Sequence, residues 1–152
     1  MAKVIYRNNI NINTSADTKQ HAIFRRMKRN GQWVGLTPQG YLSARDENGK
    51  AILVRDPERF DFITSMLKAI LNGTCTIYDV KRAFDAVYTT PKYEHNGGRK
   101  VNSIRKLKRI LLNPAYAGLV ADVDDPTVFH KGQHEAMISY EEWWDLRRRL
   151  GE

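Results

Sequence analysis

The sequence predicts an α+β fold that is mainly helical, with a three-helix core of the helix-turn-helix type, short β hairpins and a C-terminal helix. Three observations lead to it. Apolar residues recur at helical spacing in residues 60–71, 77–87 and 104–111. Only a few residues join the first two of these segments, and turn signals such as Asn48-Gly49 separate short extended runs. The 152 residues and 41% hydrophobic content are enough for one domain with its own core.

The first third of the chain predicts a helix followed by a hairpin. A helix from Thr14 or Ser15 ends at Asn30-Gly31, after a strongly basic last turn. Residues 31–41 form an extended, turn-punctuated segment because its proline and glycines resist helix formation. Asn48-Gly49 then joins strands at 41–45 and 51–54.

Capping residues mark the two helices of the helix-turn-helix unit. Asp56 is suited to cap the first and Pro57 to occupy its first position, so this helix is expected to start there and to end at Asn72-Gly73. Thr76 and Asp79 predict the start of the second. A third helix must end by Asn113, because Pro114 disfavours helix at the residue before it.

The last forty residues predict a short hairpin and a final helix. Residues 116–123 form the first strand, an Asp-Asp-Pro turn follows at 124–126, and residues 127–130 form the partner strand. Ser139 and Glu142 make a capping box for the final helix.

The third helix carries the main functional signal. Residues 99–109 contain six basic side chains and no acidic one, while Ile104, Leu107, Ile110 and Leu111 form an apolar stripe. Such a helix can pack on a core and turn positive charge outward, as contact with a phosphate backbone requires. A merely solvated basic face is the alternative.

The overall charge favours a polyanionic partner. The net charge is +8 and the isoelectric point is near 9.7. Residues 1–109 hold 21 basic and 9 acidic side chains, against 4 and 8 in residues 110–152, so the binding face should lie in the first two thirds. The basic end of the first helix and the adjoining extended segment at 31–41 form a second candidate DNA-binding region. Basic residues beside an extended backbone can follow a minor groove.

Candidate chemistry is weak everywhere else. Cys75 is the single cysteine, which excludes an intrachain disulfide and a zinc site built from several thiolates. His130 and His134 are best explained as loop histidines whose hydrogen bonds are made nearby, rather than as zinc ligands. Asp122, Asp124 and Asp125 are best explained as a solvated acidic turn rather than as a cation site. We therefore expect no catalytic residue, no metal and no cofactor, and a cytoplasmic protein without a membrane span or signal peptide.

Four segments carry a resemblance to a known family. In chain order they are Gly35-Leu36-Thr37-Pro38-Gln39-Gly40-Tyr41, Val54-Arg55-Asp56-Pro57-Glu58, Arg109-Ile110-Leu111-Leu112-Asn113-Pro114-Ala115-Tyr116-Ala117-Gly118, and His134-Glu135-Ala136-Met137-Ile138 followed by Glu141, Glu142 and Trp143. Their order and spacing resemble the recombinase domain of large serine site-specific recombinases. The family often has a tryptophan near the position of Asn102, where this chain departs from it.

The resemblance implies a DNA-binding module without catalysis. It places the helix-turn-helix region in the major groove and the segment ahead of Tyr41 in the adjacent minor groove. The family's catalytic serine belongs to a separate resolvase-like domain, which we expect to be a partner of this chain along with double-stranded DNA. The expected division is a tail and linker helix at 1–30 and a recombinase-type DNA-binding domain at 31–152. The isolated chain should be monomeric.

Ten side chains are the expected DNA contacts. They are Arg25, Arg26, Lys28, Arg29, Arg99, Lys100, Arg105, Lys106, Lys108 and Arg109. Two alternatives remain open. One is an autonomous helix-turn-helix transcriptional regulator, which would need a dimer surface matching paired half-sites. The other is a protein-interaction domain that uses Trp143, Trp144 and the acidic last third of the chain.

Overall fold

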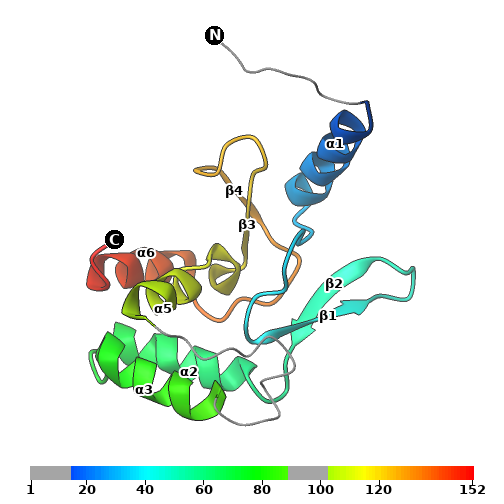
Figure 1. The fold of residues 1–152 in the computed structure, drawn as a ribbon. Helices are drawn as coiled ribbons and strands as arrows, with labels where there is room; N and C mark the ends of the chain where they lie inside the picture. The colour runs from blue at the N-terminus through cyan, green and yellow to red at the C-terminus, as the bar shows by residue number, and fades with distance from the viewer. Residues whose placement is uncertain (1–14, 89–102) are drawn as a thin grey trace.

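The structure, a computed structural model, describes residues 15–88 and 103–152. Its elements confirm an α+β fold that is mainly helical, with two small hairpins and a C-terminal helix. In chain order they are α1 (Ser15–Arg29), β1 (Tyr41–Arg45), β2 (Ala51–Arg55), α2 (Phe60–Leu71), α3 (Ile77–Tyr88), α5 (Ile104–Leu111), the 3-10 helix η1 (Pro114–Ala117), β3 (Leu119–Ala121), β4 (Phe129–Lys131) and α6 (Tyr140–Arg149). Helices α2, α3, α5 and α6 gather into one cluster, while α1 and the β1–β2 hairpin extend away from it (Figure 1).

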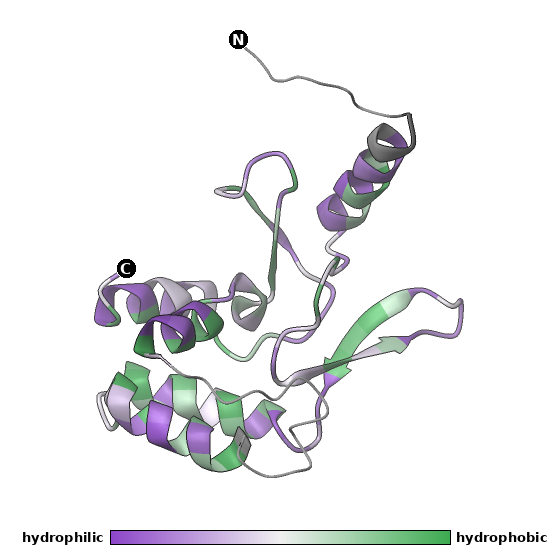
Figure 2. Cartoon of the chain, in the orientation of Figure 1, coloured by the Kyte–Doolittle hydropathy of each residue, from purple (hydrophilic) through white to green (hydrophobic). Residues whose placement is uncertain are grey.

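The helical cluster holds most of the core. Helix α2 packs against α6, and α3 packs against α5. The apolar positions expected from the sequence point inward, and those that are fully buried include Ile63, Leu67, Val80, Phe84, Leu107 and Leu111. Burial of each such side chain stabilises the fold by about 1.5–3 kcal/mol. Figure 2 shows the corresponding alternation of apolar and polar bands along α2 and α3.

The predicted caps of α3 and α6 are both present. The Thr76 hydroxyl accepts from the backbone N–H of Asp79, whose carboxylate accepts from the N–H of Thr76. At α6 the Ser139 hydroxyl accepts from the N–H of Glu142, and the Glu142 carboxylate accepts from the N–H of Ser139. These local signals were readable because a capping box needs only residues three positions apart.

Helix α2 begins later than the sequence predicts. Asp56 does accept a backbone hydrogen bond from Glu58, at 2.9 Å, but residues 57–59 form a turn and the helix starts at Phe60. The Asp56 carboxylate also binds the Nε of Arg59 at 2.9 Å. Arg59 has φ −115°, which departs from helical geometry, so the regular helix follows it.

The expected strand at 116–123 is only partly correct. Residues 114–117 form the 3-10 helix η1, because Asn113 caps the N–H of Ala115 at 3.0 Å and Gly118 closes the turn with φ +74°. The strand is therefore limited to β3. Its partner β4 lies later than the expected 127–130, since the Asp125 carboxylate holds Thr127 in the turn.

The segments that carry the family resemblance meet at one place in the fold. The carbonyl oxygen of Tyr116 accepts from the N–H groups of Met137 and Ile138. The hydroxyl of the Tyr116 side chain donates to the carbonyl of Gln39 at 2.8 Å. The Tyr41 ring stacks near Tyr116, with centroids 6.3 Å apart. Three of the four segments thus build a common structural centre that fixes η1 and the end of α5.

Candidate nucleic-acid interface

Helix α5 presents a basic face above a buried apolar one. It begins after Ser103, whose backbone is extended and whose hydroxyl accepts from the N–H of Lys106 at 3.1 Å. Leu107 and Leu111 are fully buried. The exposed side chains of this helix are Arg105, Lys106 and Arg109, while Lys108 is half-buried. The positive charge therefore sits on a helix whose position the core fixes.

Helix α5 carries four of the six basic residues of the 99–109 stretch. Because Ser103 is the N-cap, Arg99 and Lys100 precede helix α5. Both residues also lie outside the described residues. Helix α5 is thus a two-turn element at 104–111.

A hollow of about 510 Å³ lies where α5, η1 and α6 meet. Four of the side chains around it are cationic and one is a carboxylate. The lining residues are Arg105, Lys108, Arg109, Leu112, Asn113, Pro114, Arg147 and Glu152. A hollow with this excess of cations is suited to an anion.

A second hollow, of about 390 Å³, also has Lys108 among its lining residues. It lies against the turn between α2 and α3 and the end of α6, and both Cys75 and Arg149 line it. Its other lining residues are largely apolar. Lys108 therefore lines two surface depressions, one of them strongly basic.

Arg147 lines the first hollow and is not among the residues that the sequence predicts as DNA contacts. Its guanidinium lies over the rings of Trp143 and Trp144, at 5.2 and 5.5 Å from their centroids. Its neighbours Arg148 and Arg149 instead pair with Asp145, at 3.2 and 3.0 Å. The hydrogen bond from Arg149 is the main reason that the pKa of Asp145 is lowered. A run of three arginines in an acidic third of the chain gives no sign of this difference.

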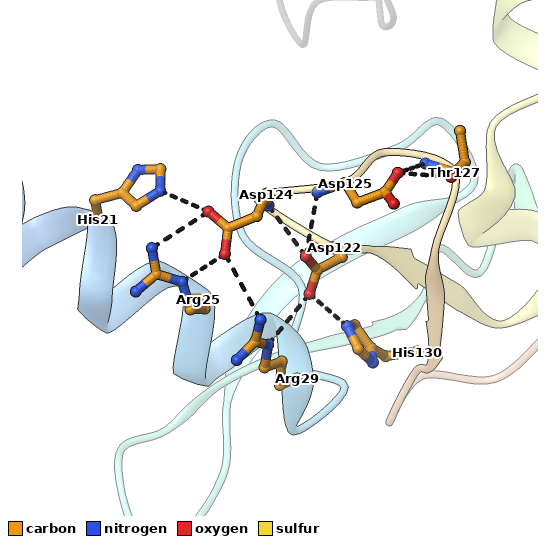
Figure 3. Close-up of polar contacts among 8 residues, drawn as sticks. All are labelled: His21, Arg25, Arg29, Asp122, Asp124, Asp125, Thr127 and His130. Carbon is orange, nitrogen blue, oxygen red and sulfur yellow. Dashed lines mark hydrogen bonds and ion pairs between the residues drawn. The ribbon is translucent and has the colours of Figure 1, made fainter.

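Two of the four predicted contacts on α1 are held by carboxylates. Figure 3 shows His21, Arg25 and Arg29 directed from α1 toward the turn between β3 and β4. Arg25 binds Asp124 with its Nε 2.6 Å from Oδ2, and His21 lies 3.2 Å from the other oxygen. The hydrogen bond from Arg25 is the main cause of the lowered pKa of Asp124, and it raises the pKa of Arg25 in turn.

Asp122 is the buried member of this acidic turn. It accepts from His130 at 2.7 Å and from Arg29 at 3.3 Å, and its second oxygen accepts backbone N–H groups of the turn. These hydrogen bonds, led by that from His130, hold the pKa of Asp122 well below its usual range. Arg26 is exposed and Lys28 half-buried on the same helix. Helix α1 and helix α5 lie on separate parts of the molecule (Figure 1).

The remaining candidate residues are used structurally. His134 donates to the carbonyl of Ala115 at 2.7 Å, and burial lowers its pKa. Trp143 is buried and donates to the carbonyl of Leu112, so it is not free to recognise a partner protein. Within residues 15–88 and 103–152, no group of histidine, cysteine and carboxylate side chains is placed to hold a metal ion. None of the described helices is long and apolar enough to span a bilayer.

Comparisons with known proteins find similarity only among solved structures. A chain from a crystal structure of an LSR–DNA complex, LSR being a large serine recombinase, matches 87% of this chain and 38% of its own, at 16% identity and a TM-score of 0.49. A chain from the structure "Sequence Requirements of the Listeria innocua prophage attP site" matches 86% of this chain and 51% of its own, at 20% identity and a TM-score of 0.46. No family model and no curated protein matches.

Large serine recombinases are the family that the sequence motifs resemble. The described chain spans about two fifths and one half of the two solved chains.

Proposed function

We propose that this chain binds double-stranded DNA as part of a serine site-specific recombinase and positions the DNA for a catalytic resolvase-like domain. The observation that carries the proposal is the two-sided character of helix α5. Leu107 and Leu111 anchor the helix in the core, while Arg105 and Arg109 border a hollow with excess positive charge. Because the core fixes the helix backbone, the helix itself does not have to be ordered when its charged side chains meet a phosphate backbone.

The side chains on α5 divide into two roles. Arg105, Lys108 and Arg109 line the hollow and contact backbone phosphates. Lys106 is exposed outside that lining and is available for a base edge or a neighbouring phosphate. Arg99 and Lys100, which lie outside the described residues, are proposed as further DNA contacts on their charge alone.

Helix α1 has a secondary role in this proposal. It belongs to the linker region at 1–30, which joins the DNA-binding domain at 31–152 to the catalytic domain. Arg26 and Lys28 support the minor-groove side, whereas Arg25 and Arg29 hold the helix to the β3–β4 turn. The module works as a monomer on one arm of its site.

Binding to duplex DNA over a range of salt concentrations tests the proposal. Arg105→Gln and Arg109→Gln should each weaken binding to all duplexes alike and lower the salt slope by about one unit. Lys50→Gln, an equal loss of charge at the exposed β1–β2 turn, is the matched control and should leave the slope unchanged. Parent-like binding by the double variant Arg105→Gln/Arg109→Gln would contradict the proposal.

Sedimentation of the free chain separates this function from the autonomous regulator. A monomer supports a module that acts within a larger recombinase. A stable dimer that binds paired half-sites would favour the regulator instead, because such proteins match the symmetry of their operators.

A further inference from the structure

We infer that the hollow between α5 and α6 is a phosphate-binding site and that Arg147 of α6 is one of its ligands. The inference rests on the proposed function and deepens it, because it brings the C-terminal helix into the DNA interface. The four cationic side chains around the hollow come from both helices, three from α5 and one from α6. One backbone phosphate seated there would be held from two sides.

Arg147 is held in place by an aromatic platform. Its guanidinium lies 5.2 Å from the centre of the Trp143 ring and 5.5 Å from that of Trp144. The Trp143 ring is itself fixed, because its Nε1 donates at 3.1 Å to the carbonyl of Leu112, the C-cap residue of α5. The platform therefore links the position of Arg147 to the helix that supplies the other three cations.

The position of Arg147 at the hollow suits its N–H groups to an anion. A guanidinium carries five N–H donors in a planar fork, a geometry that matches a phosphate. Arg148 and Arg149 each direct an N–H group to the Asp145 carboxylate. Of the three consecutive arginines, Arg147 is the one that the structure places beside the hollow of α5.

The size and lining of the hollow fit a phosphodiester better than a purely apolar ligand. Its volume of about 510 Å³ exceeds that of a lone phosphate group and leaves room for the adjoining sugars. Glu152 is the one carboxylate among the lining residues, and it opposes an anion there. A free phosphate ion and a phosphate in the DNA backbone share the chemistry of this site, so the experiment treats them separately.

The first arm of the experiment measures duplex affinity against salt. Arg147→Gln should weaken binding about tenfold at low salt and lower the salt slope by about one unit. Arg148→Gln removes the same charge from the adjacent position and should change both quantities much less. Arg147→Lys should keep the salt slope, because the positive charge remains. It should bind duplex DNA less tightly than the parent, because lysine lacks the planar fork of the guanidinium.

The second arm uses inorganic phosphate and does not depend on DNA. Phosphate should shift the indole N–H resonances of Trp143 and Trp144 in a ¹H–¹⁵N spectrum, because Arg147 lies over both rings. The shifts should disappear in Arg147→Gln and persist in Arg148→Gln. Circular dichroism of each variant confirms that the helices are intact.

The outcomes separate the two proposals. If the α5 variants lose duplex binding while Arg147→Gln matches Arg148→Gln in both arms, the phosphate site is overturned and DNA binding through α5 stands. If the parent fails to bind any duplex but phosphate shifts the indoles in an Arg147-dependent way, the proposed function fails and a phosphate site remains. If neither arm depends on Arg147 and the α5 variants bind normally, both are overturned.

The acidic side chain at the hollow gives a test of opposite sign. Glu152→Gln should tighten duplex binding, because it removes the carboxylate that opposes a bound phosphate. Glu47→Gln makes the same change of charge at the exposed β1–β2 turn and is the control. Equal effects of the two substitutions would show that only the net charge matters and would count against a phosphate seated in the hollow.

Discussion

Arg25 of α1 and Asp124 of the β3–β4 turn form a two-point ion pair although 99 residues separate them in the sequence. The Nε of Arg25 lies 2.6 Å from one carboxylate oxygen and Nη2 lies 3.2 Å from the other. His21 and Arg29, each four residues from Arg25, face the same acidic turn. One charged face of α1 thus matches the turn, and this match fixes the helix against the hairpin.

The ion pair between Arg25 and Asp124 should therefore be energetically coupled. Arg25→Gln and Asp124→Asn are each expected to increase hydrogen exchange in the last turns of α1, and the double variant should add little to either. The coupling should shrink as salt is raised, because both side chains are partly exposed. Arg26→Gln, on an exposed neighbour, should show no coupling to Asp124→Asn. Additive effects throughout would contradict the contact.

Acid should release α1 from the hairpin. The carboxylates of Asp122 and Asp124 have pKa values lowered by their hydrogen bonds, so the folded state favours their charged forms. Their contribution to stability is complete above the ordinary aspartate pKa of about 4 and is lost as pH falls through the lowered folded values. Hydrogen exchange of α1, expressed relative to the intrinsic exchange rate of free amides at each pH, should rise in that window.

A substitution that removes one carboxylate supplies the control for this pH dependence. The amide side chain in Asp122→Asn cannot ionise. The exchange of α1 relative to the intrinsic rate should therefore already be raised at neutral pH in this variant, and it should depend less on pH below about 4. An unchanged pH profile in that variant would mean that other groups govern the release. The same variant also replaces the charged acceptor of His130 by a neutral amide, so its result is compared with that of Asp124→Asn.

Gly31 should be intolerant of any side chain. Its φ of +83° disfavours other residues, and a Cβ built there would lie 2.2 Å from the carbonyl oxygen of Lys131. Its own carbonyl accepts from the N–H of Gln133 at 2.8 Å, so the chain cannot move away without losing this contact. Gly31→Ala should lower the free energy of unfolding by more than about 1–2 kcal/mol.

Gly35→Ala isolates the part of this cost that comes from backbone strain. Gly35 also has a positive φ, +111°, but no atom lies within 4 Å of a Cβ placed there. Chemical denaturation of both variants should show the larger loss at Gly31. Equal losses would mean that the approach to Lys131 adds nothing to the strain.

Local signals in the sequence predicted most of the fold. The boundaries of β1 and the caps of α3 and α6 depend on neighbouring residues, and the apolar stripes depend on helical period. The strand in the structure is shorter than the expected 116–123. Asn113 and Gly118 favour a 3-10 turn between them, and this local signal was not recognised in the sequence. The later start of α2 follows from the turn that Asp56 makes with Arg59.

The candidate site was harder to predict because it depends on tertiary contacts. A basic residue has the same appearance in a sequence whether it faces solvent or a carboxylate, so Arg25 could not be distinguished from Arg26. Arg147 was missed for a related reason, since its position over two indoles depends on the packing of α6 against the end of α5. The burial of Tyr41 also depends on tertiary contacts, because its hydroxyl donates to the carbonyl of Glu135, 94 residues away in the sequence.

Cys75 offers a native probe of where DNA lies on the surface. It is the single cysteine of the chain, it is half-buried, and it lines the hollow that Lys108 and Arg149 border. Duplex DNA bound along α5 should slow alkylation of the thiol several-fold, because it obstructs the hollow and its phosphates disfavour the reactive thiolate. The protection should disappear in Arg105→Gln/Arg109→Gln and persist in Lys50→Gln. Alkylation at an unchanged rate under saturating DNA would place the duplex on another face, because a DNA strand along α5 lies beside Lys108 and cannot leave the adjoining hollow open.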